Sequence, residues 1–242
     1  MRIGLDHTSE IGVRAGRLLL GEPDLEFLGV LRRSTKDPDP RLRRIDTLSG
    51  LDAVVTDDPE SMVLAEALDQ GVPAVLWAES VGSASPPDEA TVLVGANLVT
   101  GLGRSLVARE EEIAGDAAEI LFAWTEPGKP LRHGEAITFP DPVGARWGTR
   151  RSMTNRRLEV AAPVPDEWAG IIVRTSTGAG TRTVGIADLA THLEAIALAA
   201  GAVVTATGGV PSGTNEPSIC ADDYLLAALR IGLDIASFTE SS

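Results

Sequence analysis

The feature that most constrains this chain is the alternation of short apolar runs with helix-like segments over its first hundred residues. The apolar runs lie in the stretches MRIGL, DLEFLGVLRRS, LDAVVTDD, VPAVLWA and TVLVGAN. An uninterrupted apolar strand is typical of a sheet covered on both faces. Strands that alternate with helices form parallel sheets through right-handed crossovers. The sequence therefore predicts an α/β fold that begins with a doubly wound parallel sheet.

Two helices are predicted between these strands. Ile11, Ala15 and Leu18 recur at helical spacing after the first strand, so they indicate an amphipathic helix. Asp58 followed by Pro59 is the pattern of a helix start, and Gly71 is a stop signal. We expect the second helix to run between these signals.

The second part of the chain has a different pattern, which is typical of an α+β sheet-plus-helix domain. The stretches AAEILFAWT, EAITFP, NRRLEVAAP, WAGIIVRTST and TRTVGIA are strand-like, and TSTGAGTRT fits a hairpin turn. Helices are expected at 188–200 and 222–235. We therefore expect a first domain at 1–108 and a substrate or dimerisation domain at 109–242, with the last helix a candidate for packing back on the first domain.

Composition excludes several classes of function. The 242 residues carry a net charge of −14, which disfavours binding to nucleic acid. A single cysteine, Cys220, rules out an internal disulfide and fits a reducing cytoplasm. We expect no membrane span and no metal site, since neither a long apolar run nor a metal-ligand spacing occurs. A homo-oligomer, dimer or tetramer, is expected because exposed sheet is usually covered.

The opening stretch MRIGLDHTSEIG reads as a strand, a loop and the start of a helix. Here the chain resembles the dihydrodipicolinate reductases and the related semialdehyde and saccharopine-type dehydrogenases, whose loops read G-x-x-G-x-[MV]-G. Gly12 matches the last glycine, whereas Asp6 and Ser9 take the first two glycine positions. The stretches VVTDDP and GANLVTG are similar to the V-D-F-T-x-P and A-N-x-x-x-G segments of the same family, through Thr56, Asp57 and Asn97.

This resemblance implies a Rossmann-like domain that binds NAD(P). The second strand ends in basic residues where a 2′-phosphate would lie, which favours NADP(H). The implied cofactor-binding residues are His7, Thr8, Ser9, Ile11, Gly12, Arg32, Arg33, Ser34, Thr56, Asp57 and Asn97. Against this, a carboxylate about 4 Å from a phosphate costs roughly 4 kcal/mol, so Asp6 predicts weak binding or a shifted pose. The alternative is that Asp6 caps the helix or accepts backbone N–H groups in a loop that holds no nucleotide.

The chemistry of the family is not matched. The reductases carry an E-x-H-H strand that supplies a proton donor, and Trp124 and Thr125 stand there instead, so the catalytic residues are unknown. The stretch RWGTRRSMTNRR holds five arginines and no acid. Arg146, Arg150 and Arg151 are therefore candidates for binding an anionic substrate. The alternative is a surface loop neutralised by the acidic stretch 109–112 or by a partner subunit.

Three hypotheses follow. The first is an NADP(H)-dependent oxidoreductase of the dihydrodipicolinate-reductase-like group that acts on a small anionic carbonyl, imine or amino-acid-like compound. The second is a non-catalytic binding or interaction protein on a reductase scaffold. The third is a subunit whose strand-rich part pairs with another chain to complete a site.

Overall fold

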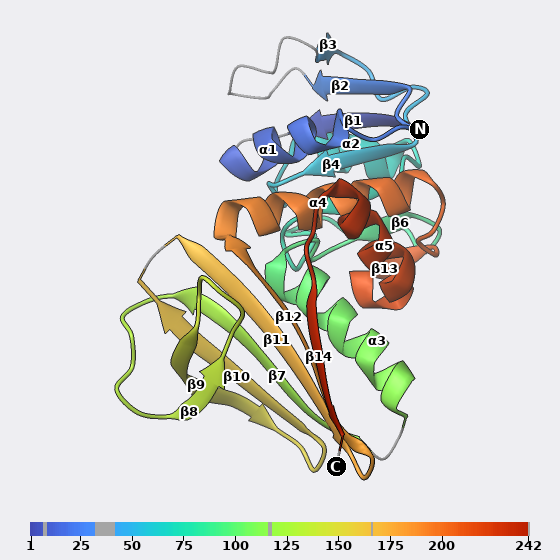
Figure 1. The fold of residues 1–242 in the computed structure, drawn as a ribbon. Helices are drawn as coiled ribbons and strands as arrows, with labels where there is room; N and C mark the ends of the chain where they lie inside the picture. The colour runs from blue at the N-terminus through green and yellow to red at the C-terminus, as the bar shows by residue number, and fades with distance from the viewer. Residues whose placement is uncertain (7–8, 32–41, 116–117, 166, 242) are drawn as a thin grey trace. The chain divides into compact units, whose positions relative to one another are not determined.

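The computed structural model describes residues 1–6, 9–31, 42–115, 118–165 and 167–241. The chain divides into two compact units (Figure 1): unit 1 consists of Met1–Leu102 and Glu194–Gly232, and unit 2 of Gly103–Leu193 and Leu233–Ser242. The sequence predicts two consecutive segments with a boundary at residue 108. In the structure, unit 1 is made of two separate segments, and most of unit 2 lies between them in the sequence.

Unit 1 contains a seven-stranded parallel sheet with the strand order β13-β6-β5-β4-β1-β2-β3. Without β13 the order is 3-2-1-4-5-6, which is that of dinucleotide-binding sheets and puts the switch point between β1 and β4. The predicted doubly wound parallel sheet is confirmed. Its strands are β1 (Arg2–Asp6), β2 (Phe27–Leu31), β3 (Arg43–Ile45), β4 (Ala53–Thr56), β5 (Ala74–Leu76), β6 (Thr91–Leu93) and β13 (Gly213–Asn215).

Helices cover both faces of this sheet. Leu5, Val55 and Val75 are neighbours in register and so share a face. Leu5 lies against Gly16 of α1 and Val75 against Gly201 of α4, so these two helices cover that face. Residues of α2 pack with β4 and β5 on the other face. The helices that lie wholly or mostly in unit 1 are α1 (Glu10–Leu19), α2 (Met62–Asp69), the π-helix η1 (Leu98–Gly103), α4 (Ala190–Ala206), the 3-10 helix η2 (Pro217–Cys220) and α5 (Ala221–Ile231).

The predicted start of the second helix was wrong. The side chain of Ser61 caps α2 by accepting the backbone N–H of Val63 at 3.0 Å, and the helix begins at Met62. Asp58 instead accepts the backbone N–H of Glu60 at 3.0 Å, which makes a turn before the helix. Two capping residues three positions apart compete here, and the later one begins the helix.

Unit 2 contains a second seven-stranded sheet with the order β14-β12-β11-β7-β10-β9-β8. Its neighbouring pairs are antiparallel except β10 with β7. The arginine-rich stretch considered as a surface loop is largely a strand, β9, which is exposed along most of its length and therefore lacks an apolar alternation. The strands are β7 (Glu119–Pro127), β8 (Glu135–Thr138), β9 (Ala145–Met153), β10 (Arg157–Val164), β11 (Trp168–Thr177), β12 (Gly180–Leu189) and β14 (Ala236–Ser241).

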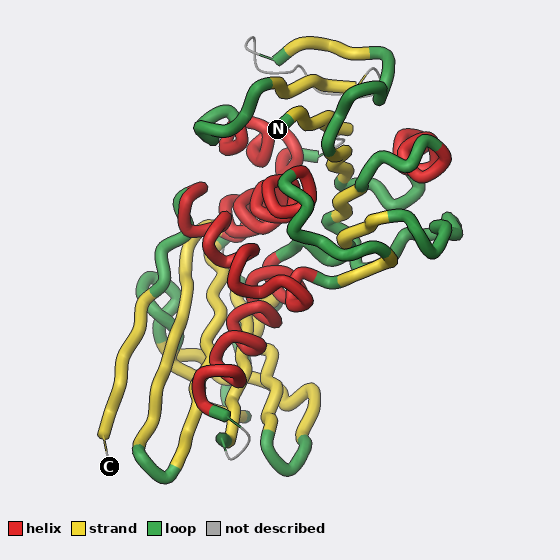
Figure 2. The backbone as a smooth tube through the Cα atoms, turned by 90° about the vertical axis from the view of Figure 1, so that its right-hand side faces the viewer, coloured by secondary structure: helices red, strands yellow, loops and turns green. Residues whose placement is uncertain are grey.

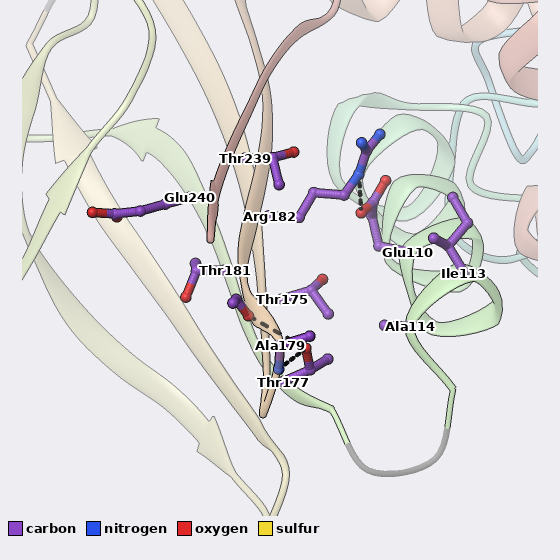
Figure 3. A pocket seen from close by; sticks show the side chains of 11 residues that line it. Glu110, Ile113, Ala114, Thr175, Thr177, Ala179, Thr181, Arg182, Thr239 and Glu240 are labelled. Atoms are coloured by element: carbon purple, nitrogen blue, oxygen red, sulfur yellow. Dashed lines mark hydrogen bonds and ion pairs between the residues drawn. The ribbon is translucent and has the colours of Figure 1, made fainter. Parts of the chain in front are cut away.

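The helix α3 (Arg104–Ala114) runs along the long strands of this sheet, as Figures 1 and 2 both show. Gly103, directly before α3, lies against Phe122 and Ile171, so the helix covers the face to which these side chains point. An ion pair between Glu110 of α3 and Arg182 of β12 fixes the helix further along (Figure 3). The opposite face holds an apolar cluster that includes Phe139. No helix among the described residues is long and apolar enough to cross a membrane.

Candidate functional site

The candidate site lies at the carboxyl ends of β1 and β4, because ligands of open α/β sheets bind at the switch point between such strands. Asp6 ends β1 and is only 3% exposed, and its carboxylate accepts a hydrogen bond from the Ser61 hydroxyl. Asp57 follows β4, and its carboxylate oxygen accepts the backbone N–H of Ser9 at 2.8 Å and the Ser9 hydroxyl at 2.5 Å. Each carboxylate thus holds the residue that caps the helix after the other strand.

Ser9 is the N-cap of α1, so the alternative in which Asp6 caps this helix was wrong. The Ser9 side chain accepts the backbone N–H of Gly12 at 3.4 Å. Helix N-termini with free N–H groups bind anions, and a nucleotide loop uses this position for the pyrophosphate. Here the carboxylate of Asp57 already accepts the N–H and the hydroxyl of the capping residue. A carboxylate of the protein itself therefore lies at the N-terminus of α1.

The other sequence-predicted residues of this region make local hydrogen bonds. The Thr56 hydroxyl accepts the Asp58 N–H at 3.1 Å and donates to the Asp58 carbonyl at 3.2 Å. The Asn97 side chain donates to the Trp77 carbonyl at 3.2 Å and accepts the Thr100 N–H at 2.9 Å. Gly12 is buried in α1 and Ile11 is half-buried there. His7, Thr8, Arg32, Arg33 and Ser34 lie outside the described residues.

A buried carboxyl group outside the set of sequence-predicted residues lies at the carboxyl ends of β5 and β6. One oxygen of Glu194 in α4 accepts the indole N–H of Trp77 at 2.7 Å and the backbone N–H of Leu98 at 2.9 Å. Burial raises the pKa of Glu194, and the two hydrogen bonds act in the opposite direction. Glu194 is the only charged residue of the apolar stretch 193–210, and that isolation was the signal in the sequence.

The phenol of Tyr224 is fully buried in unit 1, where it contacts α4. The Tyr224 hydroxyl of α5 donates to the Ala197 carbonyl of α4 at 2.8 Å. Burial raises the pKa of Tyr224 well above its usual value, and the charge of Glu194 adds to this effect. A methyl group on Gly101 would collide with the Tyr224 hydroxyl, so the glycine of the A-N-x-x-x-G segment allows α5 to approach η1 closely. Tyr224 therefore serves the packing of unit 1.

The three arginines proposed for an anionic substrate lie on β9 in unit 2. Arg150 forms an ion pair with Glu135, and Arg151 forms one with Glu126. Arg146 donates to the carbonyl of its neighbour Ala145 at 2.9 Å. Within the described part of the chain, Arg146 is thus the one of the three without a carboxylate partner.

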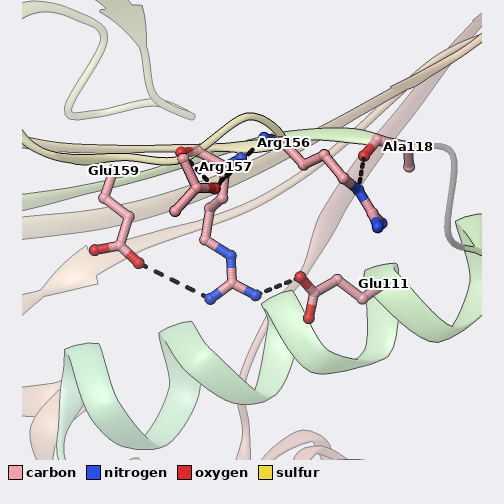
Figure 4. Close-up of polar contacts among 6 residues, drawn as sticks. Glu111, Ala118, Arg156, Arg157 and Glu159 are labelled. Atoms are coloured by element: carbon pink, nitrogen blue, oxygen red, sulfur yellow. Dashed lines mark hydrogen bonds and ion pairs between the residues drawn. The ribbon is translucent and has the colours of Figure 1, made fainter.

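The end of the same arginine-rich stretch is neutralised within unit 2. Nη2 of Arg157 forms an ion pair with Glu111, which belongs to the acidic stretch 109–112. Nη1 of Arg157 lies 3.9 Å from the Glu159 carboxylate (Figure 4). Arg156 donates to the Ala118 carbonyl at 3.4 Å. Neutralisation by the acidic stretch, which was the alternative to a binding role, therefore holds for Arg157.

No protein-family model and no curated protein matches the sequence. Solved structures match over most of the chain at low identity. A homospermidine synthase from Legionella pneumophila in complex with NAD has a TM-score of 0.59 and 8% identity, covering 99% of this chain and 91% of that one. A dipicolinate-bound dihydrodipicolinate reductase from Paenisporosarcina sp. TG-14 has a TM-score of 0.53 and 11% identity, covering 89% and 97%.

An engineered D-amino acid dehydrogenase bound to NADP+ has a TM-score of 0.53 and 14% identity, covering 90% of this chain and 93% of its own. At such identities the likeness establishes the fold and leaves substrate and mechanism open. It agrees with the strand order of unit 1 and with the resemblance found in the sequence. The chain has the fold of the NAD(P)-binding Rossmann oxidoreductases.

Proposed function

We propose that the protein is an NADP(H)-dependent oxidoreductase of the dihydrodipicolinate-reductase-like group, acting on a small anionic carbonyl, imine or amino-acid-like compound. The observation that carries this proposal is the 3-2-1-4-5-6 strand order, with polar loops after β1 and β4 at the switch point. The basic residues after β2, Arg32 and Arg33, support the choice of NADP(H) over NAD(H). Hydride transfer would be the chemistry of the cofactor, and the protein would orient the substrate.

Glu194 is the proton donor in this proposal. Its carboxyl group is held by Trp77 and Leu98 at the carboxyl edge of the parallel sheet, the edge at which the cofactor would lie. A raised pKa keeps more of the carboxyl group protonated near neutral pH, which suits a general acid. Arg146 is the first candidate for the anionic group of the substrate, because Arg150 and Arg151 already pair with glutamates.

Calorimetric titration with NADPH, NADH and their oxidised forms tests the proposal directly. Micromolar binding of NADPH that is much tighter than binding of NADH is the expected result. Arg32→Gln should then weaken NADPH binding and leave NADH binding unchanged, because it removes a contact to the 2′-phosphate. Arg44→Gln is the matched control, since Arg44 is an exposed arginine on β3. No heat and no thermal shift with any of the four nucleotides would refute a nucleotide-dependent function.

A second candidate function is a non-catalytic binding or interaction protein on the same scaffold. It is favoured by the two carboxylate–serine pairs, Asp57 with Ser9 and Asp6 with Ser61, which place two acidic groups at the switch point. The same titration separates the two candidates, because this one requires that no nucleotide binds.

We further propose a homo-oligomer, dimer or tetramer, in the cytoplasm. β14 is an edge strand of the sheet in unit 2, and its Phe238 side chain is 66% exposed. An exposed apolar edge strand is usually covered by another chain. The single cysteine, Cys220, is in keeping with a reducing compartment. Light scattering combined with size-exclusion chromatography tests the oligomer, and Phe238→Lys should lower the measured mass if β14 forms the contact.

A further inference from the structure

A row of polar side chains crosses three strands of unit 2 on the face that α3 covers. In register, Thr175 of β11 pairs with Arg182 of β12, and Arg182 pairs with Thr239 of β14. Directly paired residues project to the same face of a sheet. Figure 3 shows these three side chains on the side of α3, whereas Thr181 and Glu240 project to the other side.

A cavity of about 190 Å³ lies between this row and the C-terminal part of α3 (Figure 3). Its apolar wall includes Ala179 of the hairpin turn and Ile113 of α3. Ile113 is 58% exposed, so its side chain is accessible to a ligand from solvent. An apolar cavity of about 150 Å³ holds a benzene ring, so this cavity has room for a ring-sized apolar group. We call it the α3 pocket.

The Thr175 hydroxyl in the wall of the α3 pocket has no hydrogen-bond partner among the described residues. Thr175 is only 3% exposed, so the hydroxyl has lost its water as well. Burying a hydroxyl without a partner destabilises a fold, and valine has nearly the same shape without that penalty. A buried hydroxyl without a partner in the wall of a pocket points to a partner that comes from outside the chain.

Arg182, which is paired with Thr175 in register, supplies further donors on the same face of the sheet, and Figure 3 shows its guanidinium directed away from Thr175 and toward α3. Its Nε donates to the buried Glu110 carboxylate at 2.8 Å, and this is its only ion pair among the described residues. The pair is neutral overall, so the wall carries no net charge from these two residues. The terminal nitrogens of Arg182 remain, and two parallel N–H groups of a guanidinium are suited to a carboxylate.

We propose that the α3 pocket binds a small monocarboxylate with an apolar body. The carboxylate binds the terminal nitrogens of Arg182 and, after a small inward shift, the hydroxyl of Thr175. The apolar body contacts Ile113. This site lies wholly within unit 2 and involves none of the residues assigned to the nucleotide or to proton transfer. It therefore does not depend on the proposed oxidoreductase function.

Benzoate and butyrate are the probes, titrated into the full-length protein by calorimetry. Benzamide has the shape of benzoate without its charge, and benzylamine has the opposite charge. We expect both carboxylates to bind, benzamide to bind at least tenfold more weakly than benzoate, and benzylamine not to bind. Absence of binding by both carboxylates up to about 10 mM would overturn the proposal, since that limit is weaker than a useful ligand site.

Two variants test the residues. Arg182→Lys keeps the charge beside Glu110 but removes the fork, so it should weaken benzoate binding about tenfold. Thr175→Val should weaken it about fivefold and also raise the Tm by about 2 °C, because an unpartnered buried hydroxyl is removed. Thr183→Val is the control, on β12 but outside the pocket, and should leave benzoate binding unchanged.

The two readouts of Thr175→Val make the test decisive. A lower Tm would mean that the hydroxyl has a partner within the fold, and this result would overturn the proposal. Benzoate affinity unchanged in both Arg182→Lys and Thr175→Val would place the bound carboxylate elsewhere and would overturn it equally.

Discussion

Asp57→Asn is expected to make the protein less stable and a better nucleotide binder at the same time. Asp57 accepts two hydrogen bonds from Ser9, at 2.8 and 2.5 Å, and asparagine keeps an acceptor oxygen but loses the charge. A hydrogen bond to a charged acceptor contributes about 1 kcal/mol more than one to a neutral acceptor. The free energy of unfolding should therefore fall by about 2 kcal/mol, which chemical denaturation measures.

The gain in affinity follows from Coulomb's law. A phosphate charge at the N-terminus of α1, about 6 Å from the Asp57 carboxylate, is repelled by about 3 kcal/mol at an effective dielectric constant of 20. Removing that charge should tighten binding of NADPH about a hundredfold. The assay is calorimetric titration of the wild type and of Asp57→Asn at the same ionic strength, because salt screens this interaction.

Asp52→Asn is the matched control for this experiment. Asp52 also accepts a backbone N–H through its carboxylate, from Arg2 at 2.7 Å, but it precedes β4 instead of following it. The two carboxylates are five residues apart, about 16 Å along the strand, which is twice the screening length of about 8 Å at physiological salt. Asp52→Asn should lower stability and leave NADPH affinity unchanged. If Asp57→Asn also leaves the affinity unchanged, no phosphate binds near the Asp57 carboxylate and the reasoning is refuted.

Three further results are expected. Gly101→Ala should destabilise the fold by about 2 kcal/mol in chemical denaturation, since its methyl meets the Tyr224 hydroxyl, and Tyr224→Phe should recover part of that loss in the double variant. The raised pKa of Glu194 makes the folded state bind its proton more tightly than the unfolded state, so this group lowers stability as pH rises from 4.5 through the folded pKa. Glu194→Gln should abolish that dependence and have the higher Tm at about pH 8, and an unchanged pH profile of Tm would contradict this. Burial and the nearby charge of Asp223 raise the pKa of the Cys220 thiol to about 11, which is two units above its usual value of 9.0. Iodoacetamide at about pH 8 should therefore alkylate Cys220 about a hundredfold more slowly than an unperturbed thiol, and mass spectrometry measures this rate.

The sequence predicted the parallel sheet well, because fully buried strands such as β4 are uninterrupted apolar runs. It did not predict β13, whose three residues GTN have no strand character of their own and are paired to β6 by tertiary context. It also missed β9, because an exposed strand carries no apolar alternation. Periodicity reports burial, so an element that buries few side chains leaves little trace in the sequence.

The site was predicted in part for a similar reason. Ser9 and Asp57 were identified as loop residues, but their hydrogen bond joins positions 48 residues apart and no local pattern reports it. Glu194 is visible as a lone charge in an apolar helix, whereas its contacts with Trp77 and Leu98 depend on where that helix packs. The chemical type of a residue can be read from the sequence, and its partners follow only from the fold.

The return of the chain to unit 1 after residue 193 sets an order of events during synthesis on the ribosome. When residues 1–102 have emerged, β6 can pair with β5 on one side only, so its other side is a free edge of the sheet. At the same stage no helix covers Val75. Both are covered only when α4 and β13 have been translated, after nearly all of unit 2. The nascent chain must therefore keep an apolar sheet soluble while another unit is made, so protection against early aggregation is a demand on this protein before it has any ligand to bind.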